Sequence, residues 1–470
     1  MSSKKTVVEP RSDIGRGDKI ALVSLGCPKN LVDLQVVASA LRCAGFDVGV
    51  GEGEADAIVV NTCAFIEDAR REAVAAIDEA CSRKHGGGKC RAVIVAGCLP
   101  QRYKEAVFEA CPEVDAVIGV DDLETAPEIV RRAIDEPGRS FDAVSRGRPK
   151  KLFTAGEPWF SLAPGPYAYL KIGEGCRHAC AFCAIPGIRG RLRSRPVPVL
   201  VEEAAALVGR GIREINVIAQ DVTSYGMDLG DGTTLAALLK RLDAIPGEFR
   251  IRMLYGHPAR LTDGFLDAVA SCPKVVPYFD VPVQHASRDI LCAMDRRDTI
   301  AHVPRMAQRL RSRVPGAVVR TTCLVGFPGE TRKDFDALMR YVEESSFDHL
   351  GAFVFSPEEG TKAFDMPGAV ARRTAERRRE RLMLLQARIV AETLDALAGS
   401  VVTVLLETPP ARRGGAWIGR CERQAPDDID GLTRVKGLPP TAKPGDFVRC
   451  KITGHAGYDI NAVALAGGED

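Results

Sequence analysis

Short apolar runs alternate with amphipathic segments over the first part of the chain, from Lys19 to Val144. The runs KIALVSLGC, AIVVNTC and AVIVAGC are short and almost wholly apolar, as the buried strands of parallel sheets are. The stretches LVDLQVVASALRCAG and IEDARREAVAAIDEAC, which follow the first two runs, have the pattern of amphipathic helices. This alternation predicts a parallel α/β sandwich over residues 19–144.

Each of the three apolar runs ends on a cysteine, namely Cys27, Cys63 or Cys98. The cysteines are spaced by about one βαβ unit, which predicts neighbouring strands. Because ligands bind outside the carboxyl ends of parallel strands, the three thiols are expected to converge at one sheet edge. Three small core residues would show the same spacing, since free cysteine often packs as a small hydrophobe. Both interpretations stay open on these residues alone.

A second pattern begins after a basic stretch rich in Gly and Pro, residues 145–166, which we interpret as a linker. Six strand-like runs then alternate with helices, and a long charged helix, TAERRRERLMLLQARIVAETLDALAG, ends the pattern. Six β/α units are fewer than a closed barrel needs, so residues 167–398 are predicted to form an open, partial (β/α)6 barrel. Its site is expected at the carboxyl ends of the strands YAYLKIG, REINVIAQ, RIRMLYG, YFDVPVQ, VVRTTCLVG and HLGAFVFS.

From residue 399 to 470 the sequence pattern changes to short β-like runs separated by Gly, Pro and Asp. The runs VVTVLLE, AWIGR, DFVRCKIT and INAVALA predict a small antiparallel β-barrel. This part carries nine basic and nine acidic residues, so its charge gives no reason to expect RNA binding.

Composition excludes several classes of protein. The net charge of +2 over 470 residues gives no global attraction for polyanions. Residues 1–18 contain no apolar segment of a signal peptide, and they are expected to be a disordered leader. No apolar run is long enough to span a bilayer. Fifteen cysteines without a secretory signal favour metal ligation over disulfides, so we expect a cytoplasmic protein with no membrane partner.

A second cysteine trio, Cys176, Cys180 and Cys183, follows the first strand of the predicted barrel in the run GEGCRHACAFC. The spacing is too compact for a tetrahedral zinc site, because the only further ligand nearby, His178, lies inside the loop. Three thiolates at this spacing suit a [4Fe–4S] cluster that keeps one iron open. Two such trios in one chain predict two open iron–sulfur clusters.

The cysteine loop resembles the cluster motif of the radical S-adenosylmethionine (SAM) enzymes. The resemblance implies that the open iron binds SAM and that an electron from the cluster generates a 5′-deoxyadenosyl radical. It also implies cofactor contacts at Phe182, Gln220, Asp221, Gly326, Glu330 and Phe355. Phe182 would serve equally well as a core aromatic residue. The glycines of VGFPGE could simply form the turn before a helix.

From about Lys19 to about Ala466 the chain is similar to the methylthiotransferases of this superfamily, which combine a three-cysteine domain, a radical SAM barrel and a TRAM β-barrel. The stretches that favour the members acting on a ribosomal protein are SLGCPKNLVD, VNTCAFI, AIPGIRGRLRSRP, AQDVTSYG, PYFDVPVQHAS and IGRCERQAPDDIDG. Members of the MiaB type, which modify tRNA adenosine, typically have Gln and Asn where this chain has Pro28 and Asp221.

The resemblance implies methylthiolation of the β-carbon of an aspartate in small-subunit ribosomal protein twelve, within the assembled or assembling subunit. Two [4Fe–4S] clusters, SAM and an electron donor such as flavodoxin or ferredoxin would be needed. The sulfur source, the reductant, any presenting protein and the oligomeric state are not readable from the sequence. Neither is the residue that orients the target aspartate.

Four arginines follow the cysteine loop at alternate positions, and of these Arg195 is our candidate for contact with the cofactor or the substrate. A solvated cationic loop explains most of them equally well. His257 and His285 are interpreted as packing residues, and the nine cysteines outside the trios as inert. Two other functions compete with the main interpretation. One is a tRNA methylthiotransferase, and the other is an RNA- or ribosome-binding factor whose clusters are only structural or carry electrons.

Overall fold

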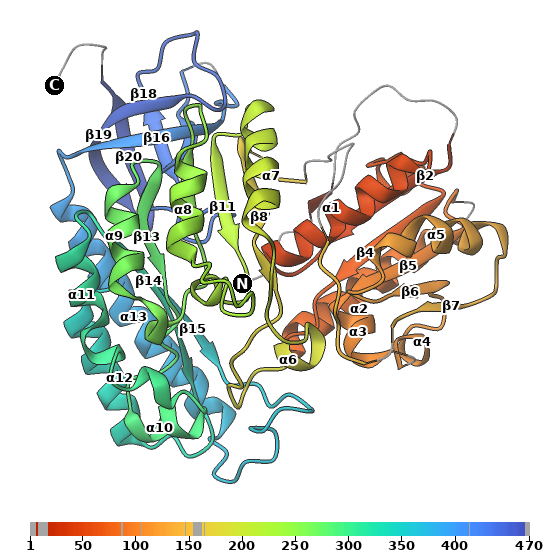
Figure 1. Ribbon diagram of the computed structural model, residues 1–470, viewed down its shortest axis with the longest axis horizontal. Coiled ribbons are helices and arrows are strands. Elements are labelled where there is room, and N and C mark those ends of the chain that lie inside the picture. Colours follow the sequence, from red (N-terminus) through yellow and green to blue (C-terminus); the bar gives the residue numbers. More distant parts are fainter. Residues whose placement is uncertain are drawn as a thin grey trace.

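The computed structural model describes residues 6–7, 17–85, 88–104, 106–145, 147–153, 162–163, 165–412 and 414–465. Figure 1 shows an N-terminal α/β unit packed beside a central barrel, with a small β-barrel at one end of the central barrel. Parts of the predicted leader and linker lie outside the described residues. No helix in the described ranges is both long enough and apolar enough to cross a membrane.

The N-terminal unit is a sheet in the order β1-β2-β4-β5-β6-β7, with β3 also paired to β2. Its strands are Thr6–Val7 (β1), Lys19–Ser24 (β2), Asp47–Val48 (β3), Ala57–Thr62 (β4), Ala92–Gly97 (β5), Ala116–Ile118 (β6) and Phe141–Ala143 (β7). Its helices are Pro28–Cys43 (α1), Glu67–Ser82 (α2), Cys98–Tyr103 (α3), Ala106–Ala110 (α4) and Ala126–Asp135 (α5). Ile20 and Leu22 pack in the core that contains α1 and α5, and Ala21 and Val23 in the core that contains α2. The predicted α/β sandwich is confirmed.

Strand β1 corrects the expectation of a disordered leader at Thr6 and Val7. Strand β1 lies inside the segment predicted to be a disordered leader, and it pairs antiparallel with Val23 and Ser24 of β2. Strand β3 pairs with the other end of β2, at Lys19 and Ile20. The end of β2 that β3 leaves free offers unpaired backbone groups, which a short edge strand can satisfy.

The central barrel is an open parallel sheet in the order β15-β14-β13-β12-β11-β8. Its strands are Tyr167–Lys171 (β8), Glu214–Ile218 (β11), Arg250–Met253 (β12), Val275–Asp280 (β13), Val318–Val325 (β14) and His349–Val354 (β15). The helices between and after them are Val197–Gly209 (α7), Leu235–Asp243 (α8), Asp263–Ser271 (α9), Arg288–Ala293 (α10), Met306–Arg313 (α11), Arg332–Ser345 (α12) and Arg372–Ala396 (α13). The predicted partial (β/α)6 barrel is confirmed, and the chain traverses the sheet once from β8 to β15.

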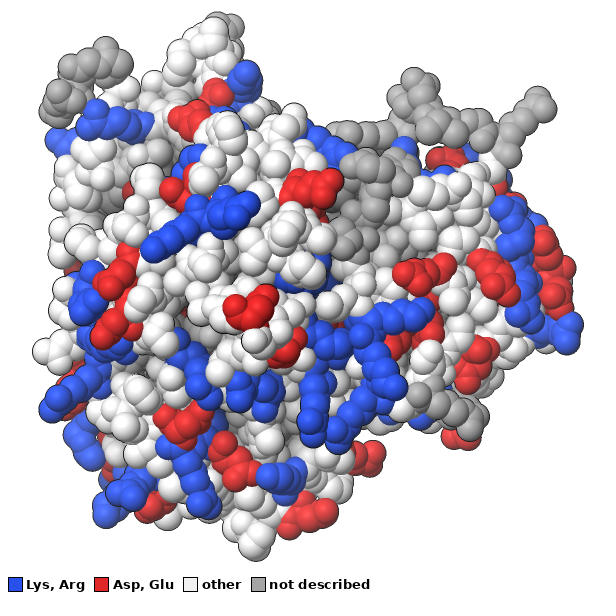
Figure 2. Space-filling model, in the orientation of Figure 1, with Lys and Arg blue, Asp and Glu red and all other residues white. Residues whose placement is uncertain are grey.

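The loop between β8 and α7 carries three short elements, which are Gly173–Glu174 (β9), Ile185–Ile188 (α6) and Arg193–Ser194 (β10). Helix α6 lies where the N-terminal unit meets the barrel (Figure 1). Charges of both signs are mixed over the face shown in Figure 2, and Lys and Arg gather around α6.

The two edges of the barrel sheet differ. All five residues of β8 are buried, and α1 of the N-terminal unit lies against this strand. In β15 only Leu350 is buried, and within the described residues β15 pairs with β14 alone. The barrel is therefore covered on one edge and open on the other.

The C-terminal barrel is closed in the order β16-β17-β18-β20-β19, with the strands Val401–Thr408, Trp417–Cys421, Thr433–Lys436, Asp459–Ala464 and Phe447–Ala456 in that order. It was predicted to be antiparallel, but β18 and β20 run parallel. The hairpin partner of β20 is β19, which also pairs with β16, so β20 can close the barrel only against β18. Strand β18 is the strand that the apolar runs did not reveal.

Buried ion pairs fix the C-terminal barrel to the amino-terminal end of the central one. Arg420 lies 2.7 Å from Glu214, the first residue of β11, and neither side chain is more than 1% exposed. In the loop after β17, Asp430 accepts a hydrogen bond of 2.5 Å from the Tyr278 hydroxyl and pairs with Arg320. This end of the barrel is therefore closed, and the carboxyl ends of the strands are left for a site.

Candidate functional site

Cys27, Cys63 and Cys98, which we call the N-terminal trio, lie at the carboxyl ends of the neighbouring strands β2, β4 and β5. Gly26 shows how close the segments come, because a Cβ at this position would lie 2.6 Å from the Cβ of Cys63. Its φ of +90° is also one that glycine adopts without strain. The structure thus brings the trio to one edge of the sheet, as the spacing predicts.

The thiols of the N-terminal trio influence one another. Burial first, and then the thiols of Cys98 and Cys27, raise the pKa of Cys63 to about 12. Burial also raises the pKa of Cys98, although Arg189 opposes this. Three thiolates this close would repel one another unless cations held them. Iron supplies such cations and binds cysteine as thiolate, so the donor set fits an iron–sulfur cluster.

Cys176, Cys180 and Cys183, the barrel trio, lie on the loop between β9 and α6. Backbone hydrogen bonds hold this loop, from Cys176 N to Gly190 O at 3.2 Å and from Cys183 N to Cys180 O at 3.0 Å. Burial, more than the neighbouring thiols, raises the pKa of Cys183 to about 12 and that of Cys176 to about 11. This donor set fits a cluster for the same reason.

Neither trio has the spacing of a single-ion site. Among the described His, Cys, Asp and Glu residues, the only three whose ligand atoms all lie within 4.8 Å of one another are His178, His257 and Asp298. A cubane places each thiolate on a different iron, so its three sulfurs stand further apart than the ligands of one ion. Because neither trio is found among such groups, both suit a cluster better than a single zinc ion.

A buried ion network, formed by Asp33, Lys171, Glu174 and Arg189, joins the N-terminal unit to the barrel. The Lys171 ammonium and the Arg189 guanidinium both donate to Asp33 of α1, and they lie 2.9 Å and 3.3 Å from Glu174. Burial opposes ionisation of Glu174, but Lys171 and Arg189 hold the pKa of that carboxyl below its usual range.

Arg189 extends this network to the N-terminal trio. Its guanidinium donates to the Sγ of Cys98 at 3.0 Å and to Asn30 Oδ1 at 2.6 Å. Arg189 is also the residue after α6, the helix that follows the barrel trio directly. One side chain therefore links the loop of the barrel trio to a sulfur of the other trio.

The predicted aromatic contacts Phe182 and Phe355 lie together. Both pack on a small apolar cluster beside the barrel trio, and the ring of Phe355 meets that of Phe327 edge-on at 5.2 Å. The structure thus brings these two positions to one patch, which offers an apolar surface to a flat ring.

The predicted polar contacts Gln220 and Asp221 behave differently. The Gln220 amide donates to Glu174, while its Oε1 is buried and has no hydrogen-bond partner among the described residues. An ammonium group could satisfy that oxygen. The Asp221 carboxylate instead accepts hydrogen bonds from His178 Nε2 at 2.8 Å and Thr223 N at 3.0 Å. Burial opposes this ionisation, yet these hydrogen bonds lower the pKa of Asp221.

Gly326 and Glu330 are joined by a hydrogen bond. The Gly326 amide donates to the Glu330 carboxylate, which is buried and lies 3.2 Å from Arg378 of α13. A Cβ at Gly326 would come within 2.4 Å of the Cβ of Ala375, so only glycine allows α13 to pack here. The turn that the sequence analysis left as an alternative explanation is therefore present.

Arg195 does not lie with these groups. Its guanidinium pairs with Glu203 of α7 and donates to the Lys171 carbonyl oxygen at 2.8 Å. Its predicted contact with cofactor or substrate stays a prediction, and these contacts give Arg195 a role in holding α7 to the barrel.

The two histidines also differ. The backbone N–H of Ser287 donates to His285 Nδ1 at 3.0 Å, while the buried Nε2 of His285 lies 3.9 Å from Glu330 and has no hydrogen-bond partner among the described residues. His257 is buried, stacks on His178 at 3.9 Å and has no hydrogen-bond partner for either ring nitrogen among the described residues. Burial, together with Arg296, lowers the pKa of His257 to about 2, so its ring is neutral. It is not the satisfied packing residue that the sequence suggested.

Sequence reasoning missed Lys29, whose ammonium lies 3.3 Å from the ring centroid of Tyr255. Burial lowers the pKa of Lys29, although Cys27 and Asp280 oppose this. Tyr255 has a φ of +70° and donates its backbone N–H to Asp280 at 3.1 Å. The position of Lys29, two residues after Cys27, could have drawn attention to it. The backbone of Tyr255 leaves no signal in the sequence.

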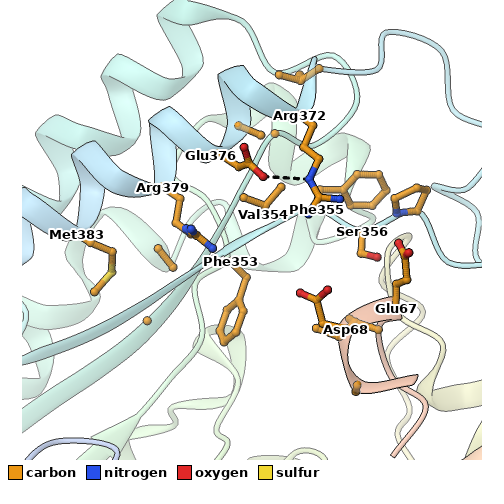
Figure 3. Close-up of a pocket in the computed structure, with 18 of the residues that line it drawn as sticks. Glu67, Asp68, Phe353, Val354, Phe355, Ser356, Arg372, Glu376, Arg379 and Met383 are labelled. Atoms are coloured by element: carbon orange, nitrogen blue, oxygen red, sulfur yellow. Dashed lines mark hydrogen bonds and ion pairs between the residues drawn. The ribbon is translucent and has the colours of Figure 1, made fainter. Parts of the chain in front are cut away.

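A cavity of 1220 Å³ follows the open edge of the barrel. Figure 3 shows Glu67 and Asp68 of α2 on one side of it and Arg372, Glu376 and Arg379 of α13 on the other. The cavity reaches the predicted cofactor positions Gly326 and Phe355 at one end. None of the six trio cysteines is among the described residues that line it.

Three family models match the chain in order. They are the uncharacterized protein family UPF0004 over residues 19–119, the radical SAM superfamily over 170–342 and the TRAM domain over 398–465. In overall fold the chain resembles the radical SAM methyltransferase TsrM of Kitasatospora setae. That similarity has a TM-score of 0.54 and 15% identity, and it covers 91% of this chain and 82% of the other.

Curated relatives are much more similar in sequence. The protein of Syntrophus aciditrophicus is 43% identical over 96% of this chain and 99% of its own length, and that of Trichlorobacter lovleyi is 42% identical over 94% and 97%. The protein of Geobacter sulfurreducens is 41% identical over 94% and 98%. All three are named ribosomal protein uS12 methylthiotransferase RimO. With this identity over nearly its whole length, the chain belongs to the RimO family of radical SAM methylthiotransferases.

Proposed function

We propose that this protein methylthiolates the β-carbon of an aspartate in ribosomal protein uS12. The observation that carries the proposal is the pair of open cysteine trios, which one buried arginine links across a single interface. A structural or electron-carrying site is normally closed by four ligands. Two sites that each offer three cysteines suit a reaction that uses an open iron at both. The names of the relatives favour uS12 over tRNA as the substrate.

Each trio would hold one [4Fe–4S] cluster, and the two would have different tasks. When bound, the cluster of the barrel trio supplies the electron that converts SAM into a radical able to remove a hydrogen from an unactivated carbon. Gln220 Oε1 is free to accept a hydrogen bond from the SAM ammonium, and Phe182 and Phe355 offer their patch to the adenine. Asp221 would shape the site indirectly, because its carboxylate accepts a hydrogen bond from His178 in the loop of the barrel trio.

The ion network and Lys29 would limit water at the site and supply charge there. The ion network around Arg189 and Asp33 closes the covered edge of the barrel, which limits water near the radical. Lys29 lies beside Cys27 of the N-terminal trio, where its amine would meet the target carboxylate. Flavodoxin or ferredoxin would supply electrons in the cytoplasm, and uS12 would be modified within the assembled or assembling small subunit.

Mass spectrometry tests this function directly. The reconstituted, reduced enzyme is given SAM and sulfide, together with small ribosomal subunits and bulk tRNA in one tube. A gain of one CH2S unit on an aspartate of uS12 is expected. Methylthioadenosine in the tRNA with unmodified uS12 would contradict the proposal.

A further inference from the structure

Strand β15 is an edge of the barrel sheet that packs one face against α13, while its outer edge pairs with no further strand of the described residues. It pairs with β14 from His349 to Val354, and no other strand of the described residues pairs with it. The opposite edge strand, β8, is buried along its whole length beneath α1. A strand edge left open in this way presents backbone N–H and C=O groups that another extended chain can pair with.

The cavity of 1220 Å³ follows this edge along its whole length. Every residue from His349 to Pro357 lines it, a length of about 20 Å for the strand itself at ~3.3 Å per residue. Asp428 and Tyr458 of the C-terminal barrel border it at one end, and Phe355 and Glu67 at the other. We call this cavity the edge groove. Its length suits an extended peptide.

Side chains alternate along β15, so one face of the strand packs into the protein and the other faces the groove. Leu350, Ala352 and Val354 pack into the barrel core. Phe353, which is 39% exposed, points into open space in Figure 3. The strand edge between these two faces is therefore reachable from the groove.

The groove is acidic. Five carboxylates line it against three guanidiniums, and three of the carboxylates, Glu67, Asp68 and Glu72, come from the first turns of α2. Arg372 and Glu376 pair with each other at 2.9 Å, as Figure 3 shows, and Asp68 pairs with Arg71 of its own helix, so the acidic excess of the groove is a matter of its total charge. A protein that binds ribosomal RNA carries Lys and Arg to neutralise phosphates, so its loops complement such a wall.

We propose that the substrate segment carrying the target aspartate binds in the edge groove as an added strand that pairs its backbone with the free edge of β15. This inference rests on the proposed function and specifies how its substrate is held. The bound segment would end beside Phe355 and the loop after Cys63, next to the predicted cofactor positions. Backbone pairing would fix its register, and the α2 carboxylates would select basic side chains.

N-methylation of the peptide backbone tests the pairing. A synthetic uS12 peptide centred on the modified aspartate is methylated at one backbone nitrogen at a time, and its binding to the reconstituted enzyme is measured by competition with intact uS12. We expect affinity to fall at least about tenfold at alternate positions and to change little at the others, because consecutive N–H groups of a strand point to opposite sides, so only every second one faces β15. A flat profile would overturn the proposal. So would failure of the unmodified peptide to compete while intact uS12 is still modified.

Charge variants test the acidic wall. The double substitution Asp68→Asn, Glu72→Gln should raise KM for uS12 about fivefold without changing kcat, because rim charges guide binding and not chemistry. Asp78→Asn, farther along α2 and outside the groove, is the matched control and should change nothing. Equal effects of both variants would contradict a specific acidic wall.

Hydrogen exchange on the intact enzyme identifies the occupant. The amides of β15 should become protected when uS12 is added, while those of the edge strand β7 stay unchanged. Protection of β15 that appears without uS12 and rises with enzyme concentration would mean that a second copy fills the edge, which overturns the proposal. If the enzyme modifies uS12 but these tests fail, the function stands and only the mode of binding is wrong.

Discussion

The two cysteine trios reach similar chemistry by opposite routes. The barrel trio lies on one short loop, and local backbone hydrogen bonds shape it. The N-terminal trio is gathered from three strands, and its position depends on the whole sheet. Each trio has one arginine at a sulfur, Arg296 at 3.6 Å from Cys180 and Arg189 at 3.0 Å from Cys98.

This difference has a consequence for stability and function. A change near the barrel trio acts on a loop that β9 and α6 already hold, so its effect should be confined to the chemistry. A change near the N-terminal trio acts on the interface between two domains, because Arg189 and Asp33 serve both. Variants of the two trios should therefore differ in their effects when radical formation and methylthiolation are measured on the same enzyme.

The largest effects should come from the cysteines themselves. Cys180→Ala should abolish both 5′-deoxyadenosine formation and methylthiolation, since no cluster would remain to reduce SAM. Cys63→Ala should abolish methylthiolation and leave 5′-deoxyadenosine formation within about threefold, because it leaves the barrel trio intact. Chromatographic assay of 5′-deoxyadenosine and mass spectrometry of uS12 measure the two activities.

Cys81→Ala is the control for these variants, because Cys81 is buried in the N-terminal unit and belongs to neither trio. It should keep full iron content. Loss of 5′-deoxyadenosine in Cys63→Ala at unchanged barrel-cluster content would show that the two sites are not separable.

Replacement of Arg189 should be the most damaging change outside the cysteines. Arg189→Gln leaves Asp33 and Glu174 with one cation in place of two, and its side chain is only 2% exposed. Breaking a buried ion pair typically costs about 3–5 kcal/mol. Denaturant unfolding of the reconstituted enzyme should show this loss, while Arg191→Gln, an exposed neighbour, should not. Equal stability of the two variants would mean that the network contributes nothing.

Acid should act on the same network with a smaller effect. The pKa of Glu174 lies below its ordinary value of 4.5, despite burial, because of Lys171 and Arg189. A carboxyl with a depressed folded pKa contributes stability above its unfolded pKa, and this contribution is lost as the pH falls toward the folded value. Unfolding free energy should therefore drop below about pH 4.5. A Glu174→Gln variant should show a shallower drop, and identical pH profiles would contradict this assignment.

Substitution of Arg296 tests whether the two trios also differ in the reduction potentials of their clusters. Its cation near Cys180 stabilises the reduced, more negative cluster, so Arg296→Gln should make the barrel cluster harder to reduce and slow SAM cleavage about three- to tenfold. Potentiometric titration followed by electron paramagnetic resonance measures the potential. The second cluster should keep its potential, and a shift of both would point to general disruption.

Much of the architecture could be predicted because it depends on local patterns. Apolar runs gave the strands that end at Cys27, Cys63 and Cys98, and the tight spacing of the barrel trio needed no tertiary information. Strand β18 was missed because TRVK has only one strongly apolar residue, Val435, and its place depends on closing a barrel with β20.

The interface residues could not be predicted for a related reason. Asp33 and Lys171 meet only when two domains dock, and nothing in their own segments marks them as partners. Asp430 counted only as one of nine acidic residues in the charge balance, yet it is buried against Tyr278. Among the four loop arginines the sequence offered no reason to choose Arg189, because only the fold decides which guanidinium faces Cys98.

The smallest effect on activity is expected from Arg195, the arginine that the sequence favoured. Its guanidinium is engaged by Glu203 and the Lys171 carbonyl, so Arg195→Gln should lower the unfolding free energy by about 1–3 kcal/mol through lost buried hydrogen bonds. Activity per folded enzyme should stay within about twofold, since the guanidinium binds Glu203 of α7 and the Lys171 carbonyl. Glu203→Gln is the matched control and should destabilise the protein to a similar degree. A large loss of kcat in Arg195→Gln alone, at unchanged stability, would return Arg195 to the site and give the barrel trio a second arginine of its own.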